Sequence, residues 1–259
     1  MQLDFQRYEC KYVIPEHLHD QIVDFVQCYS HPDTFTESSK DNRYVITSLY
    51  LDSPDMICHQ AKELKSLNRF KLRIRTYGEE ADGPVFFEIK RKIKGVIFKR
   101  RVQTRRSSWM ECEYGSDKLL KDPNARNVDV MSEFVELAER YNMGPAMLVR
   151  YTREAYESDI DTYGRVTFDR KIASHFPEGY RLQTDGSGWF NLDDPIAMGG
   201  LATGTVLELK FANRAPMWMT DLVQRFRLQM RGFSKYSTAI NQGLDYYYPK
   251  HDIRIPKAA

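Results

Sequence analysis

The chain has 259 residues, of which 42% are hydrophobic and 13% aromatic, and its 38 basic and 36 acidic residues leave a formal net charge of +2. This composition is typical of a globular protein and excludes a disordered chain. The small net charge also excludes a basic field over the whole surface, so an anion site would have to come from local sorting of charge.

The sequence carries no targeting signal that we can identify. No stretch approaches the roughly 20 apolar residues of a membrane-spanning helix, and the first residues are charged where a signal peptide would be apolar. The cysteines lack metal-site spacing, which favours free thiols in a reducing compartment. We therefore predict a cytoplasmic protein with no membrane segment in this chain, folded as one domain over residues 1–259. The cysteines are Cys10, Cys28, Cys58 and Cys112.

Eight segments are rich in aromatic and β-branched residues and are bounded by turn signals, which predicts strands. In chain order they are Phe5–Ile14, Tyr44–Asp52, Phe70–Tyr77, Val85–Lys92, Val96–Thr104, Met147–Ser158, Arg165–Lys171 and Val206–Phe211. Apolar spacing predicts amphipathic helices between them. These helices follow Pro15 and cover Pro54–Leu64, Asp129–Tyr141 and Met217–Met230.

Charged and apolar residues alternate along six of the eight strands. In the third strand Lys71, Arg73 and Arg75 alternate with Leu72 and Ile74, so the two sets point to opposite faces of the sheet. In the sixth strand the pattern is less regular, and we assign Arg153 to the charged face beside Tyr151. The charged faces of the other strands carry Arg7, Glu9, Lys11, Glu88, Lys90, Lys92, Lys99, Arg101, Arg165, Asp169, Glu208 and Lys210.

A charged strand face is ordinarily just a face exposed to water. Six faces dominated by lysine and arginine, with helices to cover the apolar side, favour an inverted barrel. We predict an α+β fold, a closed eight-stranded antiparallel β-tunnel with helices packed outside. Two unit charges about 5 Å apart repel by roughly 3 kcal/mol at an effective dielectric of about 20. A phosphate chain would offset that repulsion, and the glutamates would hold Mg²⁺ or Mn²⁺.

Short motifs along nearly the whole chain resemble the catalytic domain of the vacuolar transporter chaperone complex. That domain is a polyphosphate polymerase of the triphosphate tunnel metalloenzyme superfamily, which transfers the γ-phosphoryl group of ATP to a growing polyphosphate chain. The motifs are the segments 7–12, 48–54, 71–78, 87–90, 151–153, 165–169, 206–210 and 233–236.

The resemblance implies a role for particular side chains. It implies that Glu208 binds the metal, that Tyr151 hydrogen-bonds phosphate, and that Ser234 and Lys235 contact phosphate near the tunnel mouth. The implied phosphate-binding cations are Lys11, Arg73, Arg75, Lys90, Lys99, Arg153 and Arg165. From these we assign catalysis to Arg73, Arg75, Lys90 and Lys235. The alternation adds Arg101 and Lys210 as phosphate ligands, and Glu9, Glu88 and Asp169 as further candidate metal ligands.

Two departures from the family pattern bear on the activity. Hydrolytic members of the superfamily open with Glu-x-Glu-x-Lys, and Arg7 stands here in place of the first glutamate, which favours polymerase over hydrolase. Gly232 replaces a basic residue three places before Lys235. Hydrolysis of tripolyphosphate or nucleoside triphosphate stays an alternative, as does a non-catalytic polyphosphate-binding module.

The expected partners are ATP and inorganic polyphosphate. Nucleic acid is not expected, because Phe87 and Phe98 alternate away from the cations rather than among them, where they would stack on bases. A membrane partner and the oligomeric state are left open.

Overall fold

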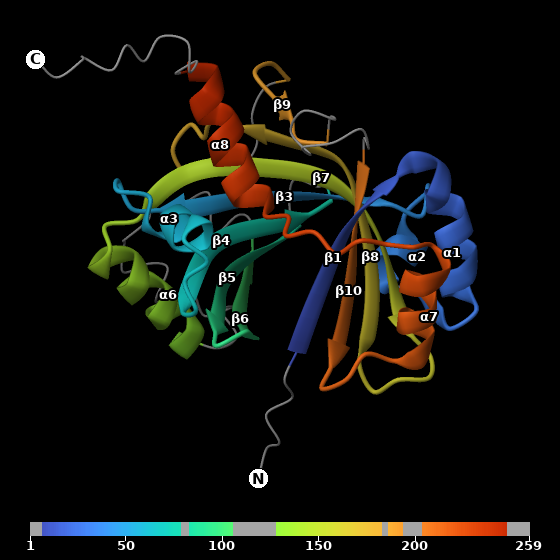
Figure 1. Ribbon diagram of the computed structural model, residues 1–259. Helices are drawn as coiled ribbons and strands as arrows, with labels where there is room; N and C mark the ends of the chain where they lie inside the picture. Colours follow the sequence, from blue (N-terminus) through green and yellow to red (C-terminus); the bar gives the residue numbers. More distant parts are fainter. Residues whose placement is uncertain (1–6, 79–82, 106–127, 183–185, 194–203, 248–259) are drawn as a thin grey trace, which may run out of the picture.

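The computed structural model describes residues 7–78, 83–105, 128–182, 186–193 and 204–247 (Figure 1). The start of the first expected strand, at Phe5, and Cys112 lie outside these ranges. Cys10, Cys28 and Cys58 are free thiols, of which only Cys58 is buried. Within the described residues, no helix combines the length and the apolar character needed to cross a bilayer.

Ten strands of the described chain form one antiparallel sheet. Their order is β2-β7-β3-β4-β5-β6-β1-β10-β8-β9, and β7 also pairs with β8. The strands are β1 (Arg7–Pro15), β2 (Ser30–Pro32), β3 (Tyr44–Asp52), β4 (Arg69–Tyr77), β5 (Pro84–Ile93), β6 (Val96–Arg105), β7 (Gly144–Ser158), β8 (Gly164–His175), β9 (Phe190–Asn191) and β10 (Gly204–Ala212).

The eight expected strands are present. The largest differences in their bounds are at β7, which begins at Gly144 rather than Met147, and at β8, which ends at His175 rather than Lys171. The short strands β2 and β9 were not expected, because two or three residues carry no readable alternation. The β5–β6 hairpin turns at Lys94 and Gly95, both with positive φ, as the turn signal predicts.

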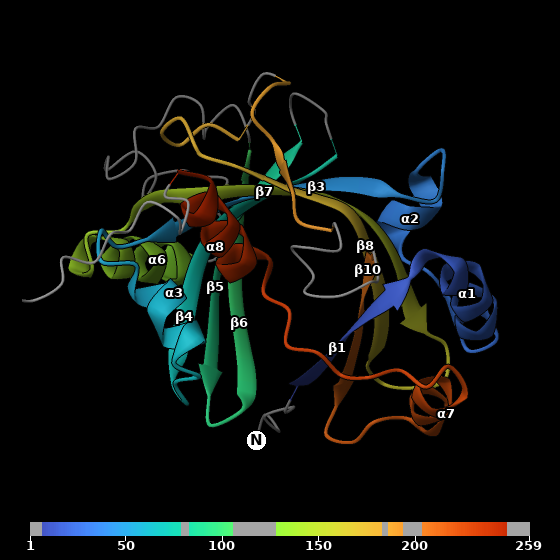
Figure 2. The same cartoon turned by 45° about the horizontal axis from the view of Figure 1, so that its top comes forward.

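The expectation of a closed tunnel is wrong at one seam. The sheet curls until β7 pairs with β8, but β1 and β6 pair only through Arg7 and Ile97. The free edge of β1 is used elsewhere, since Tyr12 forms a bridge with Met230 and the backbone N–H of Arg231 donates to the Lys11 carbonyl at 2.8 Å. Figure 2 shows this segment crossing in front of β1. The result is a curled sheet with an open β1–β6 seam.

Helices pack on the apolar, convex side of the sheet, and the first residues of α2 and α8 also reach the cavity on the concave side. They are α1 (His19–Gln27, after the 3-10 turn Glu16–Leu18), α2 (Thr34–Ser38), α3 (Ile57–Glu63), α6 (Val128–Arg140), α7 (Met217–Arg225) and α8 (Lys235–Tyr247). The helix α7 ends at Arg225, short of the expected Met230, because the chain then runs back along β1. Neither α2 nor α8 was predicted.

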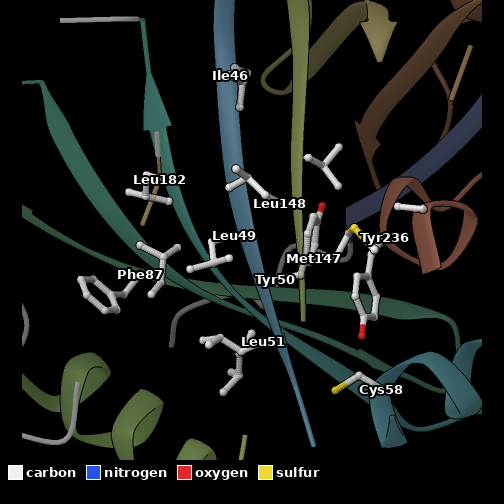
Figure 3. Close-up of a cluster of buried hydrophobic side chains, with 14 of the residues drawn as sticks. Ile46, Leu49, Tyr50, Leu51, Cys58, Phe87, Met147, Leu148, Leu182 and Tyr236 are labelled. Carbon is white, nitrogen blue, oxygen red and sulfur yellow. The ribbon is translucent and has the colours of Figure 1, made fainter. Parts of the chain in front are cut away.

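Two apolar clusters join the helices to the sheet. One lies under α3, α6 and α8 and includes Leu49, Leu51, Phe87 and Tyr236 (Figure 3). The other packs α1 and α7 against β1, β8 and β10, and its main members are Ile22, Phe168, Leu207, Trp218 and Leu222. With the apolar faces of the strands used in this way, their charged faces are left to line the concave side.

Candidate functional site

The concave side of the sheet encloses a cavity of about 780 Å³. Fifteen basic side chains line it against four acidic ones, so its charge is strongly positive although the whole chain is nearly neutral. Fourteen of the sixteen predicted site residues lie on its wall. They are Glu9, Lys11, Arg73, Arg75, Lys90, Lys99, Arg101, Tyr151, Arg153, Arg165, Glu208, Lys210, Ser234 and Lys235.

Strand β4 places three cations in a row along the cavity. Lys71, Arg73 and Arg75 all line it, while Leu72 and Ile74 between them are fully buried on the other face. Alternate residues of a strand are roughly 6.6 Å apart, so the row spans about 13 Å. Such a row can contact successive groups of an extended phosphate chain, and each guanidinium can bind two oxygens.

Glu88 lies behind this row and holds it in place. Its carboxylate has no exposed surface, accepts a hydrogen bond from Arg73 Nε at 2.5 Å, and pairs with Lys99 and with Arg75 Nη1 at 3.9 Å. Burial raises the pKa of Glu88, but the neighbouring Arg73, Arg75 and Lys99 hold it well below its usual value. Glu88 therefore stays ionised and is enclosed by cations rather than facing the cavity.

Asp169 and Glu208 form a second acidic centre on the opposite wall. Asp169 is fully buried and accepts two hydrogen bonds from Arg153, at 2.7 and 2.8 Å, and one from Lys235 Nζ at 2.5 Å. Glu208 contacts Lys210 Nζ at 2.7 Å and Lys235 Nζ at 3.4 Å. Burial raises the pKa of both carboxyls, but Arg153 and Lys235 lower that of Asp169, and Lys11, Lys210 and Lys235 hold that of Glu208 well below its usual value.

Glu9 and Glu208 share one ammonium group. Lys11 Nζ lies 3.0 Å from Glu9 and 2.9 Å from Glu208, and Lys90 reaches Glu9 at 2.8 Å across the β1–β6 seam. Among the described residues no three His, Cys, Asp or Glu side chains gather as a ready metal site. Two carboxylates nevertheless meet at one cation, and oxygen ligands of this kind suit Mg²⁺ and Mn²⁺. Glu9 and Glu208 are thus the pair that fits a divalent ion.

Lys71 on β4, which has no role from the family resemblance, reaches the start of α8. Lys71 Nζ donates to Ser234 Oγ at 2.8 Å and lies 5.2 Å from the Tyr236 ring, with no ion pair to a carboxylate of the described chain. Burial, with Lys90 and Lys11 nearby, lowers the pKa of Lys71 to about 8 although Tyr50 opposes this. Burial raises the pKa of Tyr50, but Arg73, Arg75 and Lys71 lower it to about 8.

Asp52 holds α8 at the cavity. It accepts hydrogen bonds from the backbone N–H of Cys58 at 2.9 Å and from the Tyr236 hydroxyl at 2.5 Å, and so joins α3 to α8. Ser234 precedes α8 and accepts from the backbone N–H of Ser237 at 3.3 Å, which is an N-cap contact. That cap was the signal in the sequence from which α8 could have been predicted.

At the other end of the cavity Asp33 positions Arg165. Arg165 Nη2 donates to Asp33 Oδ2 at 2.5 Å, and its Nη1 donates to Glu157 at 2.6 Å. The other oxygen of Asp33 accepts from the backbone N–H of Thr36 at 2.8 Å and begins α2. Sequence reasoning missed Asp33, whose partner Arg165 is 132 residues away.

The sequence matches the model of a known protein family. The family model described as the VTC domain matches residues 6–243. A search of curated proteins finds no match.

Solved structures that resemble the chain share little sequence with it. A Pyrococcus horikoshii protein has 12% identity and a TM-score of 0.46, covering 92% of this chain and 98% of its own. A putative adenylate cyclase of Bacillus halodurans has 9% identity, a TM-score of 0.47 and coverage of 88% and 95%. A putative adenylyl cyclase of Hippeastrum, described as having a dominant triphosphatase activity, has 13% identity, a TM-score of 0.48 and coverage of 92% and 96%.

Proposed function

The chain belongs to the VTC domain family, and from this premise we propose that it is a phosphotransferase that moves the γ-phosphoryl group of ATP onto a polyphosphate chain. The observation that carries the proposal is the cavity with fifteen basic side chains against four acidic ones. Such an excess of positive charge around one cavity is offset best by an anion of high and extended charge density. Because the cavity wall draws on strands from β1 to β10, we propose that the chain acts as one domain.

In this proposal the chain's own cations bind and orient the reacting groups. Arg73 and Arg75 on β4, Lys90 on β5 and Lys235 on α8 stabilise the charge on the transferring phosphoryl group. The remaining cations and Tyr151 position the donor and the growing chain. No general base is required, because a polyphosphate end is already anionic.

A divalent ion, Mg²⁺ or Mn²⁺, would be held by Glu208 with Glu9, in the place where Lys11 now bridges them. The ion would supply charge neutralisation between carboxylate and phosphate oxygens. Glu88 and Asp169 fit this role less well, since each is fully buried and turned toward its own cations.

Hydrolysis by the same cavity is the second candidate, and one observation counts against it. Each acidic side chain on the cavity wall is already paired with a cation, Glu9 and Glu208 with lysines, Asp33 and Glu157 with Arg165. Hydrolysis would need a further carboxylate to activate water for attack on phosphorus, and none of the four is free of a cation for that task. Transfer to an acceptor that is already anionic needs no such base.

Product analysis with ATP and Mn²⁺ tests the proposal directly. Long phosphate chains together with ADP are the expected products. Free phosphate in their place would make the protein a hydrolase, and intact ATP with bound polyphosphate would make it a binding module. Either of these results would overturn the polymerase assignment.

A further inference from the structure

Aromatic rings gather at the end of the cavity beside α2. The ring of Phe35 on α2 stacks on that of Tyr77 at 5.0 Å between centroids and 17° between planes. Phe35 also lies 5.4 Å from Tyr44, and Tyr77 meets Phe86 edge to face at 5.3 Å. Phe35 and Tyr77 both line the cavity. None of these rings is among the proposed phosphate ligands.

Phe35 is exposed although its position is fixed. It is 42% exposed, whereas Tyr44 and Phe86 are each only 7% exposed. Asp33 caps α2, and Thr36 Oγ1 accepts from the backbone N–H of Ala155 at 3.0 Å, which attaches the helix to β7. A large apolar ring that is held rigidly with one side open to a cavity is a surface suited to stacking another flat group.

The rings continue the row of cations on β4. Lys71, Arg73, Arg75 and Tyr77 alternate along the strand and all line the cavity. Tyr77 is therefore one step of roughly 6.6 Å beyond Arg75, and the Arg75 guanidinium lies 6.0 Å from its ring centroid. A nucleoside triphosphate has the same order, a row of anionic phosphates followed by a flat base.

We propose that Phe35 and Tyr77 form a nucleobase subsite, in which the base of the donor nucleotide stacks on Phe35 while its phosphates run from Arg75 toward Lys71. This subsite rests on the proposed function, because it would allow the same cavity to distinguish a nucleotide from a phosphate chain without a base. It also fixes the direction of the donor, with its terminal phosphate toward Ser234 and α8.

The subsite binds a base through the area of its stacking contact rather than through a pattern of hydrogen bonds. Both carboxylate oxygens of Asp33 are already engaged, by Arg165, by the Tyr44 hydroxyl at 3.0 Å and by Thr36. Stacking without specific hydrogen bonds tolerates any base and favours larger ones. ATP and GTP should therefore bind with similar affinity, and CTP and UTP more weakly.

The test compares two ligands that share phosphates but not a base. Binding of ATP and of inorganic tripolyphosphate, both without metal, would be measured by calorimetry on the wild type and on Phe35→Ala. Loss of one stacked base should weaken ATP binding about fivefold or more and leave tripolyphosphate affinity unchanged. Phe98→Ala is the matched control, because Phe98 on β6 is 43% exposed but lies off the cavity wall. It should change neither affinity.

A second variant reports on contact directly. Phe35→Trp keeps a large ring, and its fluorescence should be quenched by ATP but not by tripolyphosphate, with Phe98→Trp unresponsive to both. Equal weakening of both ligands by Phe35→Ala, or no weakening of either, would overturn the subsite while leaving the phosphate cavity intact. A wild type that binds neither ligand would overturn the proposed function and the subsite with it.

Discussion

The two walls of the cavity balance their charge in different ways. On the wall of β4, β5 and β6, a single carboxylate, Glu88, lies with no exposed surface behind Arg73, Arg75 and Lys99. On the wall of β1, β8 and β10, Glu9 and Glu208 reach the cavity surface and interleave with lysines. The first wall thus presents only cations to a ligand, and the second presents both signs.

This difference suggests a division of labour. A wall that offers only cations can bind phosphate alone, whereas a wall that offers carboxylates beside cations can hold phosphate and a divalent ion together. The predictions below test that division, beginning with the largest expected effect.

Removing the charge of Glu88 should destabilise the protein most. Glu88→Gln leaves Arg73, Arg75 and Lys99 crowded without their counter-charge, and breaking a buried ion pair in this way costs about 3–5 kcal/mol. The free energy of unfolding would be measured with urea. Glu136→Gln is the control, since its pair with Arg140 is on the surface of α6.

Added tripolyphosphate sharpens this test. It should recover part of the stability lost in Glu88→Gln, because it returns negative charge to the same cations. If Glu88→Gln and the wild type unfold at the same urea concentration, the row of cations on β4 does not depend on the buried carboxylate of Glu88.

Removing the charge of Glu208 should separate catalysis from anion binding. Glu208→Gln should lower turnover with ATP and Mn²⁺ at least about a hundredfold, because the proposed metal ion would lose its main carboxylate ligand. Its metal-free affinity for tripolyphosphate should stay the same or rise, because one repulsive charge is gone. Turnover near the wild-type rate would show that Glu208 is not the metal ligand and that another carboxylate, such as Glu9, is the better candidate. A collapse of metal-free affinity would show that Glu208 holds lysines in place.

Shortening a cation of the β4 row should weaken binding on the first wall. Arg73→Ala and Arg75→Ala should each lower tripolyphosphate affinity at least about tenfold, since each loses charge-assisted contacts to phosphate. A fluorescent nucleotide titration would measure this. Arg181→Ala is the control, because Arg181 lies outside the cavity wall and is largely exposed. Unchanged affinity in the double variant would show that these side chains do not contact the ligand.

Lys71 should give the affinity a mild pH dependence. Its pKa is lowered to about 8 by burial, so it is charged below that pH and loses its charge above it. Metal-free tripolyphosphate affinity should therefore fall severalfold between about pH 7 and 9. Lys71→Gln should bind more weakly at pH 7 and lose part of this decline. A profile identical to the wild type would exclude Lys71 from the binding site.

Strand alternation predicted the charged face because it is a local property. Arg73 and Arg75 could be placed with Leu72 and Ile74 alone, and the structure puts all four where the pattern does. Even Arg153, on a less regular strand, lines the cavity beside Tyr151 as assigned. The roles of these residues in binding and catalysis stay predictions.

The features that could not be predicted from the sequence depend on contacts between segments far apart in the chain. The pairing of Asp33 with Arg165 and of Asp52 with Tyr236 joins residues more than a hundred positions apart. The open seam has the same origin, because the bridge of Tyr12 to Met230 competes with β6 for the edge of β1. A strand pattern shows which face a residue takes but not which neighbour its backbone will find.

The segment at Met230 and Arg231, which crosses β1, also affects whether two copies of the protein can associate through their strand edges. An open seam leaves two strand edges whose unpaired N–H and C=O groups could recruit a strand from another molecule. Met230 and Arg231 cover part of the edge on β1. On β6 the run from Lys99 to Arg101 is exposed and positively charged, which repels an identical edge. The protein can thus keep its β1–β6 seam open, with side chains such as Lys90 reaching across it, without the strand edges becoming a template for aggregation.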